Sequence, residues 1–331
     1  MQLLYEPGAV ERLDTGVRSI VSWWGFSPSA TVTLLNLSEN ATYHAMDDAS
    51  GHELILRVYR PGYRTRPEIL SELAWIEVIR AERIVSTPAP VHTIDGSLLC
   101  SFEDSGQQRY VGAFEYLRGR EPNATDDLVP WFERLGATTA RLHQQSRAWS
   151  RPPGFIRKSW TYETILGPSP YWGNWRAALG LDASGMRILE RTEALLRRQL
   201  AQYGMAHDRF GLIHADLRLA NLLVRDDDLA VIDFDDCGFS WFCFDFAAAV
   251  TFIEHEPYLP SLKAAWTAGY RRAVPLAVED ELALEMFVML RRMQVTAWIA
   301  SHSETRTAQE MGIPYTEGTV RLADAYLARP S

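Results

Sequence analysis

The sequence predicts an α+β fold with a strand-rich first part and a helical second part. Short segments rich in β-branched and aromatic residues fill the first third of the chain, and polar turns separate them. From about residue 128 onward, apolar residues recur at helical spacing instead. We place the boundary near residue 118, which predicts two domains, residues 1–117 and 118–331.

Length and composition are those of a globular protein that is long enough for two domains. The chain has 331 residues, of which 47% are hydrophobic and 23% are charged. Its net charge of −9 argues against a protein that binds nucleic acid through a basic surface. The three cysteines form no paired motif, and the apolar segments are too short for a membrane span. We expect a cytoplasmic protein with neither a nucleic-acid nor a membrane partner.

The first domain is predicted to combine an antiparallel meander with two helices. Periodic apolar residues and a tryptophan pair predict a helix over residues 9–25. Five strands are predicted, at residues 31–37, 41–46, 53–60, 97–102 and 108–117. Between the third and fourth strands, Thr65 and Glu68 have capping-box spacing and Pro67 suits a first turn. The second helix is therefore predicted to begin at Thr65 and to end near Arg83.

Helices dominate the predicted second domain. They are expected at residues 128–142, 183–203, 241–255, 260–273, 279–302 and 315–328. The stretch 149–175 is rich in proline and tryptophan, and we interpret it as an insertion packed against the helices. Two short apolar segments, 222–224 and 229–233, flank the polar turn RDDD and predict a β-hairpin.

Polar side chains suited to catalysis lie around this hairpin. His214, Asp216 and Asn221 precede its first strand, and Asp233 ends its second strand. Because Mg²⁺ prefers oxygen ligands, Asn221 and Asp233 are predicted to hold the metal, which leaves Asp216 to accept a proton. The set matches the H-R-D-x-x-x-x-N pattern of phosphoryl transfer to a hydroxyl, except that Ala215 stands at the arginine position.

Phosphoryl transfer also needs a cation that binds the nucleotide phosphates. Arg57 lies in the predicted strand 53–60, where a kinase carries a lysine, and Glu72 on the following helix is its predicted ion-pair partner. A guanidinium is longer than an ammonium and can contact phosphate through two N–H groups. Arg57 is therefore predicted to bind phosphate in a way that lysine would not.

In these features the sequence resembles the aminoglycoside phosphotransferase-like family of protein-kinase-like enzymes, which includes choline kinases and type II homoserine kinases. The matching segments occur in family order: SENATY (38–43), LRVYR (56–60), SELAWIEVIRA (71–81), AFEYLRG (113–119), HADLRLAN (214–221), VIDFDD (231–236) and FDFAAA (244–249). AWIASHSET (297–305) is similar to the branch near homoserine kinases and bacterial stress-response kinases. The resemblance implies a two-lobed protein-kinase-like fold, with ATP and Mg²⁺ bound between a small sheet-containing lobe and a larger helical lobe.

The resemblance also implies roles for residues that bind the nucleotide. Arg57 would contact the phosphates and Glu72 would hold it in place. Residues Glu115 to Leu117 are similar to the hinge that contacts adenine through backbone groups. The glycines of the protein-kinase phosphate loop are missing between the first two strands, so Asn40 and nearby amides would cover the phosphates.

In the second domain, Asp216 is similar to the catalytic base, and Asn221 and Asp233 are similar to the metal ligands. Asp235 stands where the D-F-G motif has glycine, and it would add a further carboxylate to the metal site. Arg218 follows Asp216 by two residues. It is expected either to contact the transferred phosphate or a substrate anion, or to be a solvated surface charge.

Other residues are interpreted as structural. Asp245 is similar to a buried aspartate that supports the catalytic loop, and His214 matches a structural position. Arg157 and Lys158 are interpreted as solvated surface charges. The tryptophan-rich segment is interpreted as packing, with a pocket-lining role for Tyr171 or Trp172 as the alternative.

We therefore predict a kinase that moves the γ-phosphoryl group of ATP to a hydroxyl of a small, amine-bearing molecule. Asp235 and Asp236, together with the acidic composition, would favour a cationic or zwitterionic acceptor. One alternative is a protein Ser/Thr kinase of the stress-response type, although only eleven residues separate Asp233 from Asp245, which leaves little room for a peptide-docking activation segment. The other is a nucleotide-binding pseudokinase with a regulatory role, which the missing glycines and Arg57 would favour. The oligomeric state is not predicted.

Overall fold

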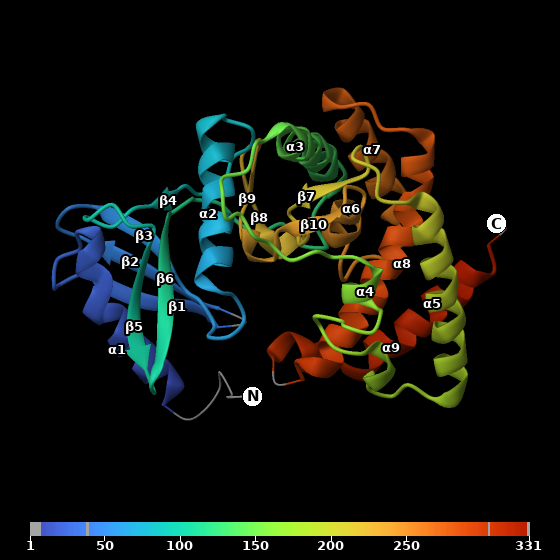
Figure 1. Cartoon of the computed structure of the whole chain (residues 1–331), viewed down its shortest axis with the longest axis horizontal. Helices are drawn as coiled ribbons and strands as arrows, with labels where there is room; N and C mark the ends of the chain where they lie inside the picture. Colours follow the sequence, from blue (N-terminus) through green and yellow to red (C-terminus); the bar gives the residue numbers. More distant parts are fainter. Residues whose placement is uncertain (1–7, 38–39, 304, 330–331) are drawn as a thin grey trace. The chain divides into compact units, whose positions relative to one another are not determined.

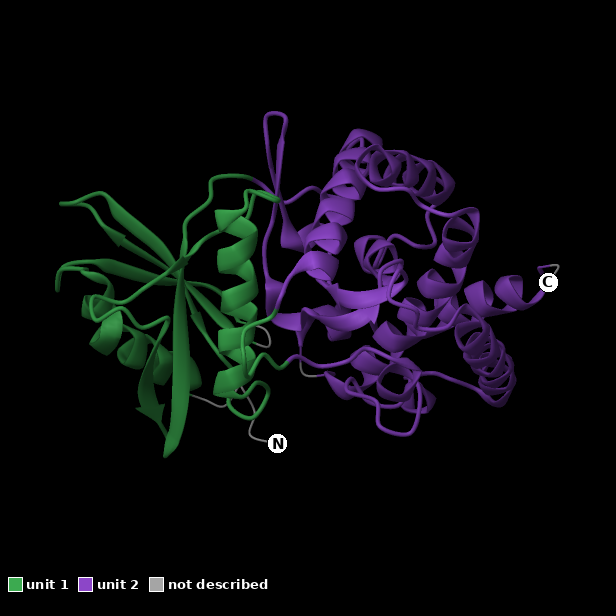
Figure 2. Ribbon diagram, turned by 45° about the horizontal axis from the view of Figure 1, so that its top comes forward, with its two compact units in different colours: residues 1–119, 151–156 green, residues 120–150, 157–331 purple. Residues whose placement is uncertain are grey.

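The computed structural model describes residues 8–37, 40–303 and 305–329 of the chain. The chain forms two compact units, shown in different colours in Figure 2. The first unit comprises the chain up to Gly119 together with residues 151–156, and the second comprises residues 120–150 and the chain from Arg157 onward. The return to the first unit at residues 151–156 has no counterpart in the sequence pattern.

The first unit is built on an antiparallel sheet (Figure 1). Its strands are β1 (Thr31–Leu37), β2 (Ala41–Asp47), β3 (His52–Val58), β4 (Pro90–Val91), β5 (Leu99–Asp104) and β6 (Gln107–Glu115). They are ordered β1-β2-β3-β6-β4, and β5 also pairs with β6. The five predicted strands are confirmed. The additional strand β4 has two residues, too few to give a pattern in the sequence.

One face of this sheet packs against the N-terminal helix α1 (Ala9–Ile20) and the short 3₁₀ helix η1 (Val21–Trp24). Strand β2 alternates strictly between buried and half-buried residues, as a strand with one face on a core should. Apolar side chains of α1 and of the sheet form one cluster, whose fully buried members include Val17, Tyr43, Leu56 and Val111. Burial of these side chains holds the sheet that carries Arg57.

Helix α2 (Arg66–Ala81) begins with the predicted capping box. The Thr65 N–H donates to Oε2 of Glu68 at 2.8 Å, and the Glu68 N–H donates back to Oγ1 of Thr65 at 3.4 Å. The helix ends two residues before the predicted Arg83. Glu72 is on its buried face, beside the apolar residues Leu73 and Ile76.

The second unit is mostly helical. Its helices are α3 (Val129–Ala148), α4 (Tyr162–Ile165), α5 (Ala183–Tyr203), α6 (Phe244–Ala249), α7 (Leu259–Ala273), α8 (Val278–Ser301) and α9 (Arg306–Leu327), with 3₁₀ turns η2 (Trp175–Ala177), η3 (Leu219–Asn221) and η4 (Phe234–Asp236). Helix α9 is kinked, because Gly312 has a non-helical backbone (φ 44°, ψ −143°) two residues before Pro314. The prediction for 315–328 found only the segment after this kink. None of the helices in the described ranges is long and apolar enough to cross a membrane.

Two short antiparallel strand pairs complete the second unit. Strands β8 (Leu222–Arg225) and β9 (Asp228–Val231) form the predicted hairpin, and β7 (Phe210–Ile213) pairs with β10 (Gly238–Trp241). The predicted helix over 241–255 is wrong at both ends, since only 244–249 is α-helical and residue 241 ends a strand. A continuous apolar run fits a buried strand and a buried helix equally well.

Helices α3 and α7 pack backbone against backbone. A Cβ atom added to Gly136 of α3 would overlap the main-chain carbonyl of Trp266, and one added to Gly269 of α7 would overlap the carbonyl of Glu133. The absence of a side chain at each glycine therefore allows the close approach of the two helices. This contact lies beside α6, whose Phe246 ring meets the ring of Trp266 at a centroid distance of 5.3 Å.

Candidate active site

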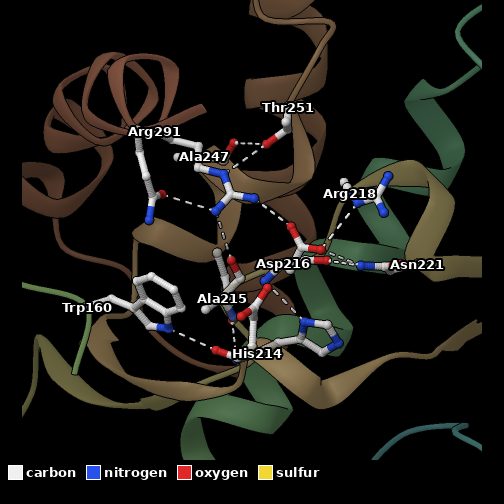
Figure 3. Close-up of polar contacts among 12 residues, drawn as sticks. Trp160, His214, Ala215, Asp216, Arg218, Asn221, Ala247, Thr251 and Arg291 are labelled. Carbon is white, nitrogen blue, oxygen red and sulfur yellow. Dashed lines mark hydrogen bonds and ion pairs between the residues drawn. The ribbon is translucent and has the colours of Figure 1, made fainter. Parts of the chain in front are cut away.

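The loop between β7 and β8 carries the predicted base, Asp216 (Figure 3). Asp216 is 9% exposed. Its Oδ2 accepts hydrogen bonds from Nδ2 of Asn221 at 2.6 Å and from Nε of Arg218 at 3.2 Å. Its Oδ1 accepts a hydrogen bond from Nη2 of Arg291 at 2.5 Å. The structure thus brings together three residues that the sequence predicted for the site, and adds an arginine from α8.

Two opposing effects set the charge of Asp216. Burial acts to raise the pKa of Asp216, but the guanidinium groups of Arg218 and Arg291 outweigh it and hold the pKa below its usual range. The carboxyl group is therefore ionised at neutral pH. An ionised carboxylate can accept a hydrogen bond from an alcohol and take its proton as the new bond forms.

Asp245 of α6 holds the backbone of this loop. Its Oδ1 accepts a hydrogen bond from the Ala215 N–H at 2.7 Å, and its Oδ2 accepts one from the His214 N–H at 3.3 Å. Nε2 of His143 also lies 2.9 Å from Oδ2. Ala215 has a left-handed backbone (φ 68°), which residues with a Cβ seldom adopt. These contacts confirm the interpretation of Asp245 as a buried support of the loop.

His214 connects the same loop to the end of β9. Its Nδ1 accepts a hydrogen bond from the Asp216 N–H at 3.2 Å, so Nε2 carries the proton and donates to the carbonyl of Ile232 at 3.1 Å. Burial lowers the pKa of His214, which keeps the ring neutral. Both ring nitrogens are used in holding the backbone, which confirms the structural interpretation.

The predicted metal ligands Asn221 and Asp233 flank the β8–β9 hairpin. The main-chain carbonyl of Asn221 accepts a hydrogen bond from the Ile232 N–H at 2.9 Å, which brings the two ends of the hairpin together. Asp233 has a left-handed backbone (φ 63°, ψ 70°), a conformation that costs free energy and is concentrated at functional sites. In the part of the chain that the structure describes, no three His, Cys, Asp or Glu residues form a metal cluster of their own. Oxygen donors from an amide and a carboxylate suit Mg²⁺, which commonly takes its other ligands from water and phosphate.

Buried side chains of the 149–175 insertion hold the turn η4 that follows Asp233. Arg157 donates from Nε to the carbonyl of Cys237 at 2.7 Å and from Nη2 to the carbonyl of Asp235. Trp160 donates from Nε1 to the carbonyl of Asp236 at 2.8 Å. The interpretation of Arg157 as a solvated charge is therefore wrong, because the residue is buried and its guanidinium donates to main-chain carbonyls. Trp160 is buried, as the packing interpretation expects.

In the first unit, the predicted ion pair is present. Nη1 of Arg57, on β3, lies 2.8 Å from Oε1 of Glu72, on α2, and the Glu72 side chain is fully buried. The guanidinium carbon of Arg57 also lies 5.0 Å from the centroid of the Phe114 ring, within cation–π range. These contacts fix the position of the cation in the sheet.

The other residues predicted to bind the nucleotide lie at strand ends of the first unit. Asn40 is buried, and its Oδ1 accepts a hydrogen bond from the Arg60 N–H at 3.2 Å. Its neighbours 38 and 39, which belong to the matched SENATY segment, lie outside the described residues. Glu115 ends β6, and its Oε2 accepts hydrogen bonds from Nη2 of Arg80 at 2.9 Å and from the Ala89 N–H at 3.2 Å. Leu117 follows β6 and is half-buried.

Comparison with known proteins decides the family. Residues 31–281 match the model of the phosphotransferase enzyme family. The chain belongs to this family. The structure of a microcompartment-associated aminopropanol kinase is similar to it, with a TM-score of 0.87 and 43% identity, covering 94% of this chain and 97% of that one.

Amicoumacin kinases are also similar to this chain. The enzyme of Bacillus subtilis (strain 168) is 24% identical over 250 residues, which cover 75% of this chain and 70% of that protein. A solved amicoumacin kinase, in complex with AMP-PNP, Ca²⁺ and Ami, has a TM-score of 0.77 at 22% identity, and the match covers 96% of each chain. The phosphotransferase is thus an enzyme that phosphorylates hydroxyl groups, and these matches favour a small-molecule acceptor over a protein.

Sequence reasoning missed Arg291, which lies 75 residues after Asp216. An arginine in a long helix is usually solvated, and its partner across the fold leaves no trace in local spacing. One signal was present in the sequence of the phosphotransferase: Arg291 and Arg292 are adjacent within a run of apolar residues. Two consecutive cations in a buried helix need specific partners.

Proposed function

We propose that this phosphotransferase moves the γ-phosphoryl group of ATP to the hydroxyl of a short amino alcohol, in an Mg²⁺-dependent reaction. The observation that carries the proposal is the 43% identity with the aminopropanol kinase over 94% of the chain. The sequence identity with the solved amicoumacin kinase is 22%, about half of the identity with the aminopropanol kinase. The acceptor is therefore expected to be closer to aminopropanol than to amicoumacin.

In the proposed reaction, Asp216 orients the acceptor and takes its proton. The carboxylate accepts a hydrogen bond from the alcohol, and the proton moves to it as the oxygen forms its bond to phosphorus and the bond to the leaving ADP breaks. Arg218, whose Nε lies 3.2 Å from Oδ2 of Asp216, is proposed to contact the transferred phosphoryl group. No covalent enzyme intermediate is required.

Asn221 and Asp233 would hold the metal, and Asp235 in the following turn is the proposed further ligand. Bound Mg²⁺ would supply neutralisation of the phosphate charge. The amicoumacin kinase complex with AMP-PNP and Ca²⁺ supports nucleotide and divalent metal binding in related proteins. Mg²⁺ and Ca²⁺ both prefer oxygen ligands of the kind that these residues offer.

We propose that Arg57, held by Glu72, binds the nucleotide phosphates, with Asn40 beside them. The backbone from Glu115 to Leu117 is proposed to contact adenine. A cytoplasmic location is proposed because ATP is the donor.

The structure removes one argument that the sequence offered for an amine-bearing acceptor. Asp235 and Asp236 are only 4% and 7% exposed, so their carboxylates do not form an acidic surface. The carboxylate of Asp216 is flanked by Arg218 and Arg291. The preference for an amine in this proposal therefore rests on the similarity to aminopropanol kinase and not on these two aspartates.

A matched pair of acceptors tests the proposal. Purified protein with ATP and Mg²⁺ is assayed against 1-amino-2-propanol and 1,2-propanediol, which carry an amine and a hydroxyl, respectively, at C1. Choline and an aminoglycoside are assayed in the same way. We expect the highest kcat/KM for the amino alcohol, and a kcat at least about 10²-fold lower with Asp216→Asn. Faster phosphorylation of the diol or of the aminoglycoside would contradict the proposed acceptor.

A further inference from the structure

Arg291 of α8 is a buried arginine whose guanidinium contacts the loop between β7 and β8, here called the catalytic loop (Figure 3). Its side chain is only 5% exposed. Nη2 donates to Oδ1 of Asp216 at 2.5 Å, and Nη1 lies 3.5 Å from the main-chain carbonyl of Ala215. One planar group therefore contacts both the carboxylate and the strained backbone that carries it.

Further contacts fix the guanidinium from its other sides. Nε donates to Oγ1 of Thr251 at 3.2 Å, and Nη1 donates to Oε1 of Gln294 at 3.1 Å. The guanidinium carbon lies 4.8 Å from the centroid of the Trp172 ring. Trp172 is itself buried, and its carbonyl accepts a hydrogen bond from Oγ of Ser301 at 2.6 Å. Arg291 is thus held by α8, by the segment after α6 and by the tryptophan-rich insertion.

The neighbouring Arg292 is buried to the same degree but contacts a different part of the unit. Nη1 of Arg292 lies 2.9 Å from Oε1 of Glu254, and Nε donates to Oγ1 of Thr319 at 2.8 Å. Nη2 of Arg292 donates to the carbonyl of Tyr315 at 3.0 Å. Tyr315 and Thr319 belong to α9 and Glu254 lies between α6 and α7, so none of these partners belongs to the loop that carries Asp216. Burial of an arginine in α8 therefore does not by itself explain the contact with Asp216.

We propose that Arg291 is a positioning residue for phosphoryl transfer, which fixes the orientation of the Asp216 carboxylate and of the Ala215 backbone. The inference rests on the proposed role of Asp216 as the base. Oδ2 is held by Asn221 and Arg218, and Oδ1 is held by Arg291, so loss of Arg291 frees one side of the carboxylate to rotate. The guanidinium contacts the two acceptors through two different nitrogens of a rigid planar fork, which the single nitrogen of a lysine ammonium does not reproduce.

The test compares Arg291→Lys and Arg291→Ala with the matched variants Arg292→Lys and Arg292→Ala. For Arg291→Lys we expect kcat to fall at least about 10-fold, with KM for ATP and for the acceptor within about twofold, because misplacement of a reacting group by about 1 Å costs up to 10²-fold in rate. Arg292→Lys should lower the melting temperature and leave kcat unchanged. Added guanidinium at low millimolar concentration should raise kcat of Arg291→Ala and leave kcat of Arg292→Ala unchanged.

Several outcomes would overturn the proposal. Wild-type kcat in folded Arg291→Lys, a rise in KM alone, or equal losses of kcat in the Arg291 and Arg292 variants would each contradict positioning. Failure of every Arg291 variant to fold would assign the residue to stability instead. If the wild-type protein phosphorylates no acceptor, the proposed function fails separately, and a crystal structure of Arg291→Lys decides this inference: a rotated Asp216 carboxylate supports it and an unchanged one overturns it.

Discussion

Arg57 and Glu72 form an ion pair between β3 and α2, with Nη1 and Oε1 2.8 Å apart and the glutamate side chain fully buried. The two residues are fifteen positions apart in sequence. A buried carboxylate without a cation would lower the free energy of unfolding, so each residue compensates the buried charge of the other. The pair therefore connects the stability of the first unit to the proposed binding of phosphate.

A double-mutant cycle tests whether the two residues act as one unit. Arg57→Met should cost about 3 kcal/mol in free energy of unfolding and raise KM for ATP, because it leaves the Glu72 charge buried. The double variant Arg57→Met/Glu72→Gln should cost much less than the sum of the single changes. Urea unfolding and steady-state kinetics measure both effects. Additive losses would show that the pair contributes no coupling.

The second prediction concerns the base. Asp216→Asn should keep the fold and the affinity for nucleotide but lower kcat at least about 10²-fold, the lower range for loss of a general base. The amide still accepts one hydrogen bond but cannot take the proton. Calorimetric titration with AMP-PNP serves as the control for binding. Turnover at the wild-type rate would remove Asp216 from this role.

The third prediction concerns the metal. Asp233→Asn should shift the Mg²⁺ dependence of nucleotide binding to higher concentration, because it removes one negative charge from the ligand set. Asp228→Asn is the matched control, since Asp228 is exposed and lies on the same hairpin. Thermal shift in an Mg²⁺ titration at fixed ATP measures the difference. Identical titrations for Asp233→Asn and wild type would exclude Asp233 as a ligand.

The fourth prediction is a loss of stability in acid. Burial lowers the pKa of His143 below its usual value of 6.5, as it does for His214. Below pH 6.5 the unfolded chain binds protons at these imidazoles and the folded chain does not, so the free energy of unfolding falls as pH decreases. Each ring contributes up to about 1.4 kcal/mol per pH unit until the folded protein also titrates.

The variant His143→Gln separates this effect from other titrating groups. Glutamine can still donate a hydrogen bond to Asp245 but takes up no proton. The slope of the unfolding free energy against pH, between pH 6.5 and 5.5, should therefore decrease by up to about 1.4 kcal/mol per pH unit, which corresponds to one proton. His255→Gln is the control, because His255 is exposed. Equal slopes for wild type and His143→Gln would show that His143 is protonated in the folded state.

Local chemistry made much of the fold predictable. The capping box at Thr65 and Glu68 and the β8–β9 hairpin depend on residues a few positions apart, and both are present. The spacing from Asp216 to Asn221 likewise fixes their contact, since the amide reaches both the backbone and the side chain of the aspartate. Patterns of this kind can be recognised in a single sequence because the interacting groups are close along the chain.

Contacts between distant segments were not predictable in the same way. Arg157 and Arg291 each donate to groups that lie more than seventy residues away, and the local sequence around each arginine does not identify these partners. The pair β7–β10 joins two four-residue strands, 25 positions apart from Ile213 to Gly238, and neither strand is long enough to show a period. The register of this pair depends on the packing of the whole second unit.

The chain passes between its two units three times, at 119–120, 150–151 and 156–157. A gene segment that ends at residue 119 therefore encodes the first unit without residues 151–156, and it omits the Ile156 N–H that donates to Oγ of Ser71 in α2 at 3.0 Å. A single recombination crossover between related genes would join α2 of one parent to a 151–156 segment of the other. Exchange of the first unit between relatives should give stable chimeras only when this six-residue segment is transferred with it.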